Sequence, residues 1–168
     1  MVKVFEDIKG NMKQFEGDLN AANIKIAFIV SRFNEFICNR LLEGAIDSFL
    51  RHEGKKENIH LYRVPGAFEL PLVSKKLANS SRFDAIVCLG AVIRGETSHY
   101  DYVCENASSG IASTSLETGI PISFGLLTTD TIEQAINRSG SKFGNHGSSA
   151  TVSAIQMASL LKQISEAQ

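Results

Sequence analysis

A glycine-containing turn and a histidine stand side by side within residues 88–110, CLGAVIRGETSHYDYVCENASSG. The apolar residues before the turn predict a buried strand, and the residues after it predict a helix. Backbone N–H groups at a helix start attract phosphate, and a glycine before them lets a ligand approach the chain closely. Gly95, Glu96 and Thr97 therefore predict an anion-binding turn, with His99 beside it as a proton carrier.

His99 falls in the first turn of the predicted helix. The positive end of the helix dipole disfavours imidazolium there, which helps to keep the ring neutral near physiological pH. A neutral imidazole can accept or donate a proton. A lone histidine is more often structural or merely solvated, so the catalytic interpretation depends on the adjoining phosphate-type turn.

Phe33 and Glu69 each have two interpretations. Phe33 stands between Arg32 and Asn34 at a predicted strand end, where its ring could stack on a flat heterocycle or serve as a hydrophobic staple for the next helix. Glu69 stands at a predicted helix start, where it could complement the helix dipole. Alternatively, its carboxylate and the backbone from Ala67 onward could bind the hydroxyl groups of a polar ligand.

A compact cationic segment comprises Arg138, at the end of a short predicted helix, and Lys142 and His146 in the glycine-rich loop that follows. Favourable placement of cations at a helix C-terminus is one explanation. A clamp on a phosphate is the other, because arginine supplies a planar bidentate donor.

Strands alternate with helices along the chain, which predicts a three-layer α/β/α sandwich with a four-stranded parallel core sheet. Helix ends are predicted at Gly54 and Gly119, and Asp130 is predicted to cap a short helix with Glu133 three residues later. The strands are predicted at 24–30, 59–64, 85–93 and 120–127, and the helices over 36–50, 68–80, 98–117, just after 130, and 152–161.

The carboxyl ends of parallel strands are where ligands bind in sheets of this kind. The four segments that follow the predicted strands should therefore form one rim, and they carry most of the unusual residues. These segments are 32–34, 65–69, 94–99 and 128–130.

The chain has 168 residues, 43% of them apolar, which suits one domain over residues 24–168. Residues 1–23 are polar and weakly periodic, and we expect an N-terminal arm there. Val2, Val4 and Phe5 could form a short strand against another surface, for which a neighbouring molecule is a candidate.

Composition and motifs exclude several classes of function. A net charge of −1 gives no reason to expect nucleic acid or an anionic membrane as partner. The sequence has no apolar run of about twenty residues and no secretory signal, so a cytoplasmic location is expected. Cys38, Cys88 and Cys104 lack metal-ligand spacing and are interpreted as reduced thiols. Walker A, GxGxxG and HExxH motifs are all missing, and we expect neither metal nor organic cofactor.

Several long motifs resemble one family. They are RFN at 32–34, VPGAFELP at 64–71, GAVIRGETSHYDYVCENASSGI at 90–111, FGLLTTDTIEQAI at 124–136, and Arg138 with GSKFGN at 140–145. Together they are similar to the 6,7-dimethyl-8-ribityllumazine synthases, the penultimate enzymes of riboflavin synthesis, over about residues 24–165. The resemblance implies a flavodoxin-like fold.

The resemblance implies a transferase that condenses 5-amino-6-(D-ribitylamino)uracil with L-3,4-dihydroxy-2-butanone 4-phosphate, releasing phosphate and water, without a cofactor. His99 would be the acid/base residue, and Glu96, Thr97 and Arg138 would bind the butanone phosphate. The ribitylaminouracil would be bound by Phe33, Ala67, Phe68, Glu69, Ala91, Val92, Ile93 and Phe124.

The family also implies a homo-oligomer. Its sites lie between the subunits of a pentamer, with Phe124 and Arg138 facing the other site residues across the interface. The uninterrupted GSKFGN turn resembles members whose pentamers form icosahedral shells, and riboflavin synthase is a candidate partner. His146 is a departure, because many relatives have lysine there, and phosphate affinity would become dependent on pH if this histidine contributes.

Two rival functions share the same fold. One is a protein that binds a lumazine or a flavin without turnover, and the other is a shell-forming container with vestigial catalysis. A riboflavin synthase of the same fold is the nearest enzymatic rival.

Overall fold

Helices and strands alternate from Ile26 onward in the computed structural model, which describes residues 12–167. The strand suggested around Val2, Val4 and Phe5 lies outside the described residues. The elements, in chain order, are β1 (Ile26–Ser31), α2 (Glu35–Arg51), η1 (Lys56–Asn58), β2 (Ile59–Val64), η2 (Ala67–Glu69), α3 (Leu70–Ala78), β3 (Ala85–Ile93), α4 (His99–Thr118), β4 (Ile122–Thr129), α5 (Ile132–Arg138), β5 (Ser139–Ser141), β6 (Gly144–Asn145) and α6 (His146–Glu166).

The main sheet has the strand order β2-β1-β3-β4, and each neighbouring pair is parallel. Every residue of β1 is buried, as are the first seven residues of β3. Strands covered on both faces need such continuous apolar runs, because neither face meets water. The predicted four-stranded parallel sheet is confirmed.

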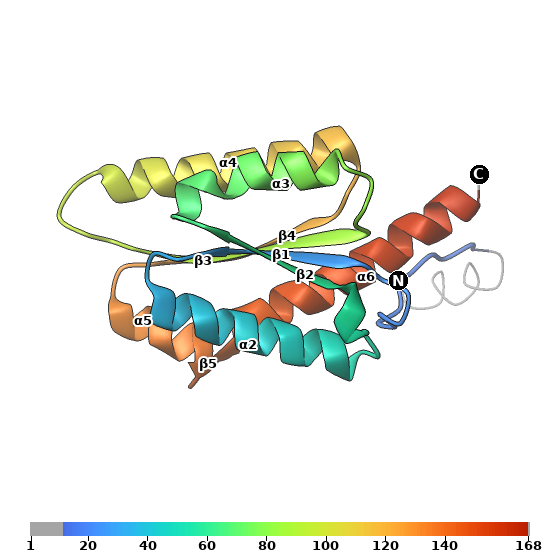
Figure 1. Ribbon diagram of the computed structural model, residues 1–168, viewed down its shortest axis with the longest axis horizontal. Coiled ribbons are helices and arrows are strands. Elements are labelled where there is room, and N and C mark those ends of the chain that lie inside the picture. The colour runs from blue at the N-terminus through green and yellow to red at the C-terminus, as the bar shows by residue number, and fades with distance from the viewer. Residues whose placement is uncertain (1–11, 168) are drawn as a thin grey trace, which may run out of the picture.

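Helices cover both faces of the sheet (Figure 1). The helices α3 and α4 lie on one face, and α2, α5 and α6 lie on the other. Alternate residues of a strand point to opposite faces, so Phe28 packs in the core beneath α2 and α6, whereas its neighbour Ile29 packs beneath α3. This arrangement is the predicted three-layer sandwich.

One of the two predicted glycine helix ends is correct. Gly119 closes α4 with a φ of 70°, in the left-handed region that glycine occupies readily. The prediction for Gly54 is wrong, because Glu53 takes the left-handed conformation there, with a φ of 68°. Gly54 instead passes so near Phe49 that a Cβ atom would lie 2.4 Å from the phenyl ring.

The predicted cap of α5 is also wrong. Thr131, not Asp130, is the N-cap, and its hydroxyl accepts a hydrogen bond from the N–H of Gln134 at 3.3 Å. The Asp130 carboxylate accepts one from Arg94 instead. The fourth strand begins later than predicted, because the Ile120 carbonyl still accepts a hydrogen bond from Ser115 at the end of α4.

The segment before β1 lies on the last helix of the same chain. The N–H of Asp18 donates to Ser159 Oγ at 3.1 Å, and Gln163 donates to the carbonyl of Glu16 at 2.9 Å. Residues 12–23 form no helix or strand. The described part of the predicted arm therefore docks on its own α6.

Candidate active site

A cavity of about 670 Å³ opens at the carboxyl ends of β1, β2 and β3. In the sheet, β2 lies on one side of β1, whereas β3 and then β4 lie on its other side. The direction in which successive strands are added therefore reverses between β1 and β3. Open parallel sheets bind ligands at such a reversal. The cavity is lined by Phe33, Pro65, Gly66, Ala67, Phe68, Glu69, Ala91, Val92, Ile93, Gly95, Thr97, His99, Tyr100 and Val103.

Phe33 presents an open aromatic face to this cavity. Its residue surface is 70% exposed, so the ring is not packed as a staple on α2. The next residue, Asn34, adopts a left-handed conformation with a φ of 57° and donates from Nδ2 to the carbonyl of Ala91 at 2.9 Å. The N–H of Phe33 donates to the carbonyl of Pro65. These two bonds join the loop after β1 to β3 and to the loop after β2.

The short helix η2 forms the opposite wall. Glu69 Oε2 accepts a hydrogen bond from the N–H of Gly66 at 2.9 Å, as a capping carboxylate does. The side chain of Asn106 on α4 donates to the carbonyl of Phe68 at 3.0 Å. Capping is thus one role of Glu69, and its position on the cavity wall leaves the ligand-binding interpretation open.

The turn between β3 and α4 offers unused donors. Among the described residues, the N–H groups of Glu96, Thr97 and Ser98 donate no hydrogen bond. His99, the first residue of α4, is exposed and donates its own N–H to Thr97 Oγ1 at 3.4 Å. Free N–H groups at the start of a long helix suit an anion. The predicted juxtaposition of this turn with an imidazole is present.

Arg94 stands between this turn and the end of β4. Its side chain donates from Nε to Asp130 at 3.0 Å and from Nη1 to Asp101 at 3.1 Å. The guanidinium lies 4.1 Å from the centroid of the Tyr100 ring. Burial raises the pKa of Tyr100, and the Thr128 hydroxyl, as a hydrogen-bond donor to the phenol oxygen, partly opposes that shift.

A second cavity of about 580 Å³ lies along β4 and the ends of α5 and α6. Phe124, Arg138 and His146 line it together with Phe143. Burial lowers the pKa of His146, the backbone of Phe124 raises it through a hydrogen bond, and the nearby Arg138 charge lowers it further.

Comparison with known proteins shows the family of this chain. The family model of 6,7-dimethyl-8-ribityllumazine synthase matches residues 23–162, which include every residue that lines either cavity. The chain belongs to the lumazine synthase family. It is 55% identical over 154 residues to the 6,7-dimethyl-8-ribityllumazine synthase of Chloroherpeton thalassium, covering 92% of this chain and 99% of that protein. It is 60% identical over 149 residues to the enzyme of the same name from Syntrophus aciditrophicus, covering 89% and 97%.

The structure divides the residues for which the lumazine synthase resemblance implies a role. Phe33, residues 67–69, residues 91–93, Thr97 and His99 share the first cavity, whereas Phe124 and Arg138 line the second. Glu96 is exposed in the turn but does not line either cavity. The predicted single rim is therefore incomplete, because Thr128 and Thr129 line the second cavity.

Sequence reasoning gave no role to four residues that line or support the first cavity: Asn34, Tyr100, Val103 and Asn106. Asparagine between a strand and a helix favours the left-handed region, so Asn34 carried a usable signal. The contact of Asn106 with Phe68 spans 38 residues and had none.

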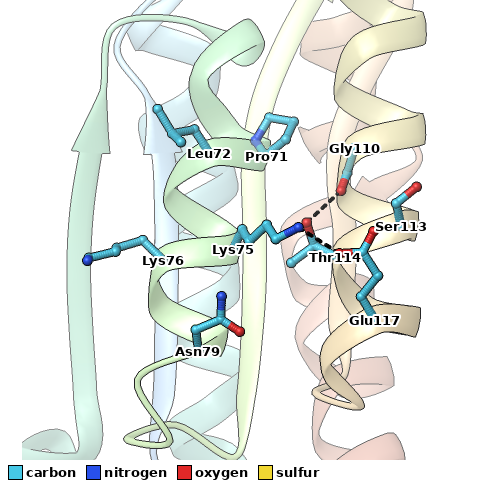
Figure 2. A pocket seen from close by; sticks show the side chains of 9 residues that line it. All are labelled: Pro71, Leu72, Lys75, Lys76, Asn79, Gly110, Ser113, Thr114 and Glu117. Atoms are coloured by element: carbon cyan, nitrogen blue, oxygen red, sulfur yellow. Dashed lines mark hydrogen bonds and ion pairs between the residues drawn. The ribbon is translucent and has the colours of Figure 1, made fainter.

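A third hollow lies between α3 and α4, away from these residues, with a volume of about 420 Å³ (Figure 2). Lys75 reaches across it to Glu117 with an N–O distance of 2.6 Å, while Lys76 points away. It carries neither a histidine nor an aromatic ring, so the first two cavities remain the candidate sites for this lumazine synthase homologue.

The three thiols are free, as predicted, with Cys38 and Cys88 buried. Burial raises the pKa of Cys38 to about 11 and that of Cys88 to about 12.

Within residues 12–167 no three metal-ligating side chains come together. Of the helices described for this lumazine synthase family member, none combines the length and apolarity that a membrane crossing requires.

Proposed function

We propose that this protein condenses 5-amino-6-(D-ribitylamino)uracil with L-3,4-dihydroxy-2-butanone 4-phosphate to form 6,7-dimethyl-8-ribityllumazine, with release of phosphate and water. One observation carries the proposal. An open aromatic ring, a turn with unused N–H donors and a histidine share one cavity in a chain of this family. The cytoplasm is the proposed location.

The pyrimidine would stack on Phe33, whose ring is largely exposed. The pyrimidine ring would also be bordered by the last three residues of β3, which line the cavity: Ala91, Val92 and Ile93. The ribityl chain would lie along Ala67, Phe68 and Glu69, because η2 presents polar backbone and a carboxylate to the cavity. This assignment favours the ligand-binding role of Glu69 alongside its capping bond.

The phosphate would lie at the start of α4. Glu96 and Thr97 would bind it through backbone N–H groups that have no other described acceptor. Arg138 would supply a bidentate cation. The free N–H groups of the turn and the arginine cation together would favour the phosphorylated ketone over its dephosphorylated form.

His99 would transfer protons during the reaction. The uracil amine attacks the ketone, and loss of water gives an imine. Phosphate then leaves, and ring closure with a second dehydration completes the lumazine. A positioned imidazole contributes about 10²- to 10⁴-fold, and much of the remaining acceleration would come from holding both substrates together.

The site would be completed by a second subunit within a homopentamer. Phe124 and Arg138 line a different cavity from His99 in the same chain, which supports a site shared between copies. Large apolar side chains such as Phe36, Leu72 and Tyr102 are more than half exposed and would be covered in the assembly. A shell of pentamers and association with riboflavin synthase extend the same proposal.

The test is to mix the two purified substrates with the protein and follow the lumazine chromophore. We expect turnover by the parent and slowed turnover by His99→Ala with folding intact. His60→Ala is the matched control, because His60 lies on β2, packs against Phe83 and does not line the cavity. Ligand binding without turnover in the parent would instead identify a non-catalytic binding protein.

A further inference from the structure

Arg94 joins three elements through one side chain. It follows β3, and its N–H donates to the carbonyl of Thr129, which adds one more backbone hydrogen bond between the β3 and β4 ends. Its guanidinium then contacts Asp130 after β4 and Asp101 in the first turn of α4, and it covers the Tyr100 ring. The two residues of α4 that it contacts directly follow His99.

The turn that Arg94 spans has little else to hold it. Residues 95–98 donate no backbone hydrogen bond among the described residues, and the bond from His99 to Thr97 is long at 3.4 Å. A Cβ atom at Gly95 would meet nothing within 4 Å. Between the last rung of the sheet and the first turn of α4, the Arg94 side chain is thus the main link, beside the contact of Tyr100 with Thr128.

We propose that Arg94 is a positioning residue, which fixes His99 relative to the ends of β3 and β4 by clamping Asp101, Asp130 and the face of Tyr100. The proposal rests on the proposed function only for its effect on turnover, since the clamp itself is a property of the fold. Arg94 lines neither cavity, so it acts through His99 and not by contact with substrate.

The geometry requires arginine. A guanidinium has a rigid fork of donors and a flat face, so it can meet two carboxylates from different elements while it stacks on a ring. A lysine ammonium is a point charge that could retain one carboxylate without the stacking. The carboxylates and Arg94 are all more than a third exposed, and ion pairs of this kind add little to global stability. Loss of the clamp should therefore misplace the turn without unfolding the protein.

The activity experiment compares Arg94→Gln, Arg94→Lys and Asp101→Asn with the parent in the lumazine assay. Misplacement of a reacting group by about 1 Å can cost 100-fold, so we expect Arg94→Gln to lower kcat by about 10- to 100-fold. The KM for the ribitylaminouracil should hold, since its proposed contacts lie on other loops. Arg94→Lys should recover part of kcat, and Asp101→Asn should lower kcat in the same direction.

Hydrogen exchange supplies a second measurement that needs no activity. In Arg94→Gln the hydrogen-bonded amides of residues 101–104 should exchange at least about 10-fold faster, as local opening of a released turn predicts. Lys75→Gln is the matched control, because Lys75 on α3 forms an exposed ion pair with Glu117, which lies at the opposite end of α4 from this turn (Figure 2). It should change neither kcat nor exchange at residues 101–104.

Unchanged kcat in Arg94→Gln, or lowered kcat with unchanged exchange at residues 101–104, would overturn the clamp. A parallel loss of kcat and of uracil affinity would do so as well, because it indicates general damage. If the parent shows no turnover, the proposed function fails, and the exchange comparison alone decides whether Arg94 holds the turn.

Discussion

Two inactive variants should restore each other's activity when they assemble together. His99→Ala damages the cavity at the β3 and α4 junction, and Arg138→Ala damages the cavity along β4. If each active site combines the first cavity of one subunit with the second cavity of a neighbour, a mixed ring contains some sites with neither substitution.

The expected recovery follows from the ring geometry. In a closed ring of identical contacts every subunit supplies one cavity of each kind, so a 1:1 random mixture leaves about one quarter of the sites intact. If both cavities of one chain served the same site, every site would carry one substitution, and no intact site would form. The shared-site model therefore predicts about a quarter of the parental activity for the mixture, whereas the single-chain model predicts only the residual activity of the two variants.

The assay requires mixed assemblies. Co-expression of the two variants with different affinity tags, followed by tandem purification, isolates them, and lumazine formation per subunit is then measured against the parent. The double variant mixed 1:1 with the parent is the control. About one quarter of parental activity is expected for a shared site, and about one half for a site within one chain.

Mixed assemblies that remain as inactive as the separate variants would refute the shared site, provided that the double-variant control gives half of the parental activity. The proposed roles of Phe124 and Arg138 in the site would then be refuted with it.

Three further predictions concern stability. Burial raises the pKa of Cys88 from 9.0 to about 12, so above pH 9 the unfolded chain loses a proton that the folded chain keeps. In urea titrations this thiol should lower stability by up to about 1.4 kcal/mol per pH unit. Cys88→Ala should remove that share of the slope and leave the share that the buried Cys38 contributes. Burial lowers the pKa of His146 below 6.5, so stability should fall as pH drops below 6.5, and His146→Gln should not show this loss. A Cβ atom at Gly147 would lie 2.2 Å from the carbonyl oxygen of Leu41, so Gly147→Ala should destabilise the fold. We expect a cost of about 1–3 kcal/mol by calorimetry, with no cost for Gly95→Ala.

The sheet was predictable because its information is local. Each strand is a short β-branched run bounded by turn residues, and a parallel order follows from the intervening helices. Gly119 was predictable for the same reason, since a helix followed by glycine has one common ending. The third strand, Ala85–Ile93, matches its prediction at both ends.

Choices between neighbouring residues were not predictable. Asp130 and Thr131 can both cap a helix, and the selection depends on Arg94, which is 36 residues away and takes the carboxylate. Glu53 takes the left-handed position that was predicted for Gly54, while Gly54 lies against the phenyl ring of Phe49, where a Cβ atom would not fit. A pattern of residue types shows neither the distant partner of Asp130 nor the packing of this ring.

The division of the site into two cavities follows from the sheet itself. The first cavity lies on the face covered by α3 and α4, since Val103 of α4 lines it and packs in the core on that side. Arg138 ends α5, which packs on the opposite face with α2 and α6 (Figure 1). His99 and Arg138 thus belong to helices on opposite faces of the sheet. This division supports the proposal that a second copy of the chain completes the site, and under that proposal the edge strand β4, with its second cavity, is the surface that the copy would meet.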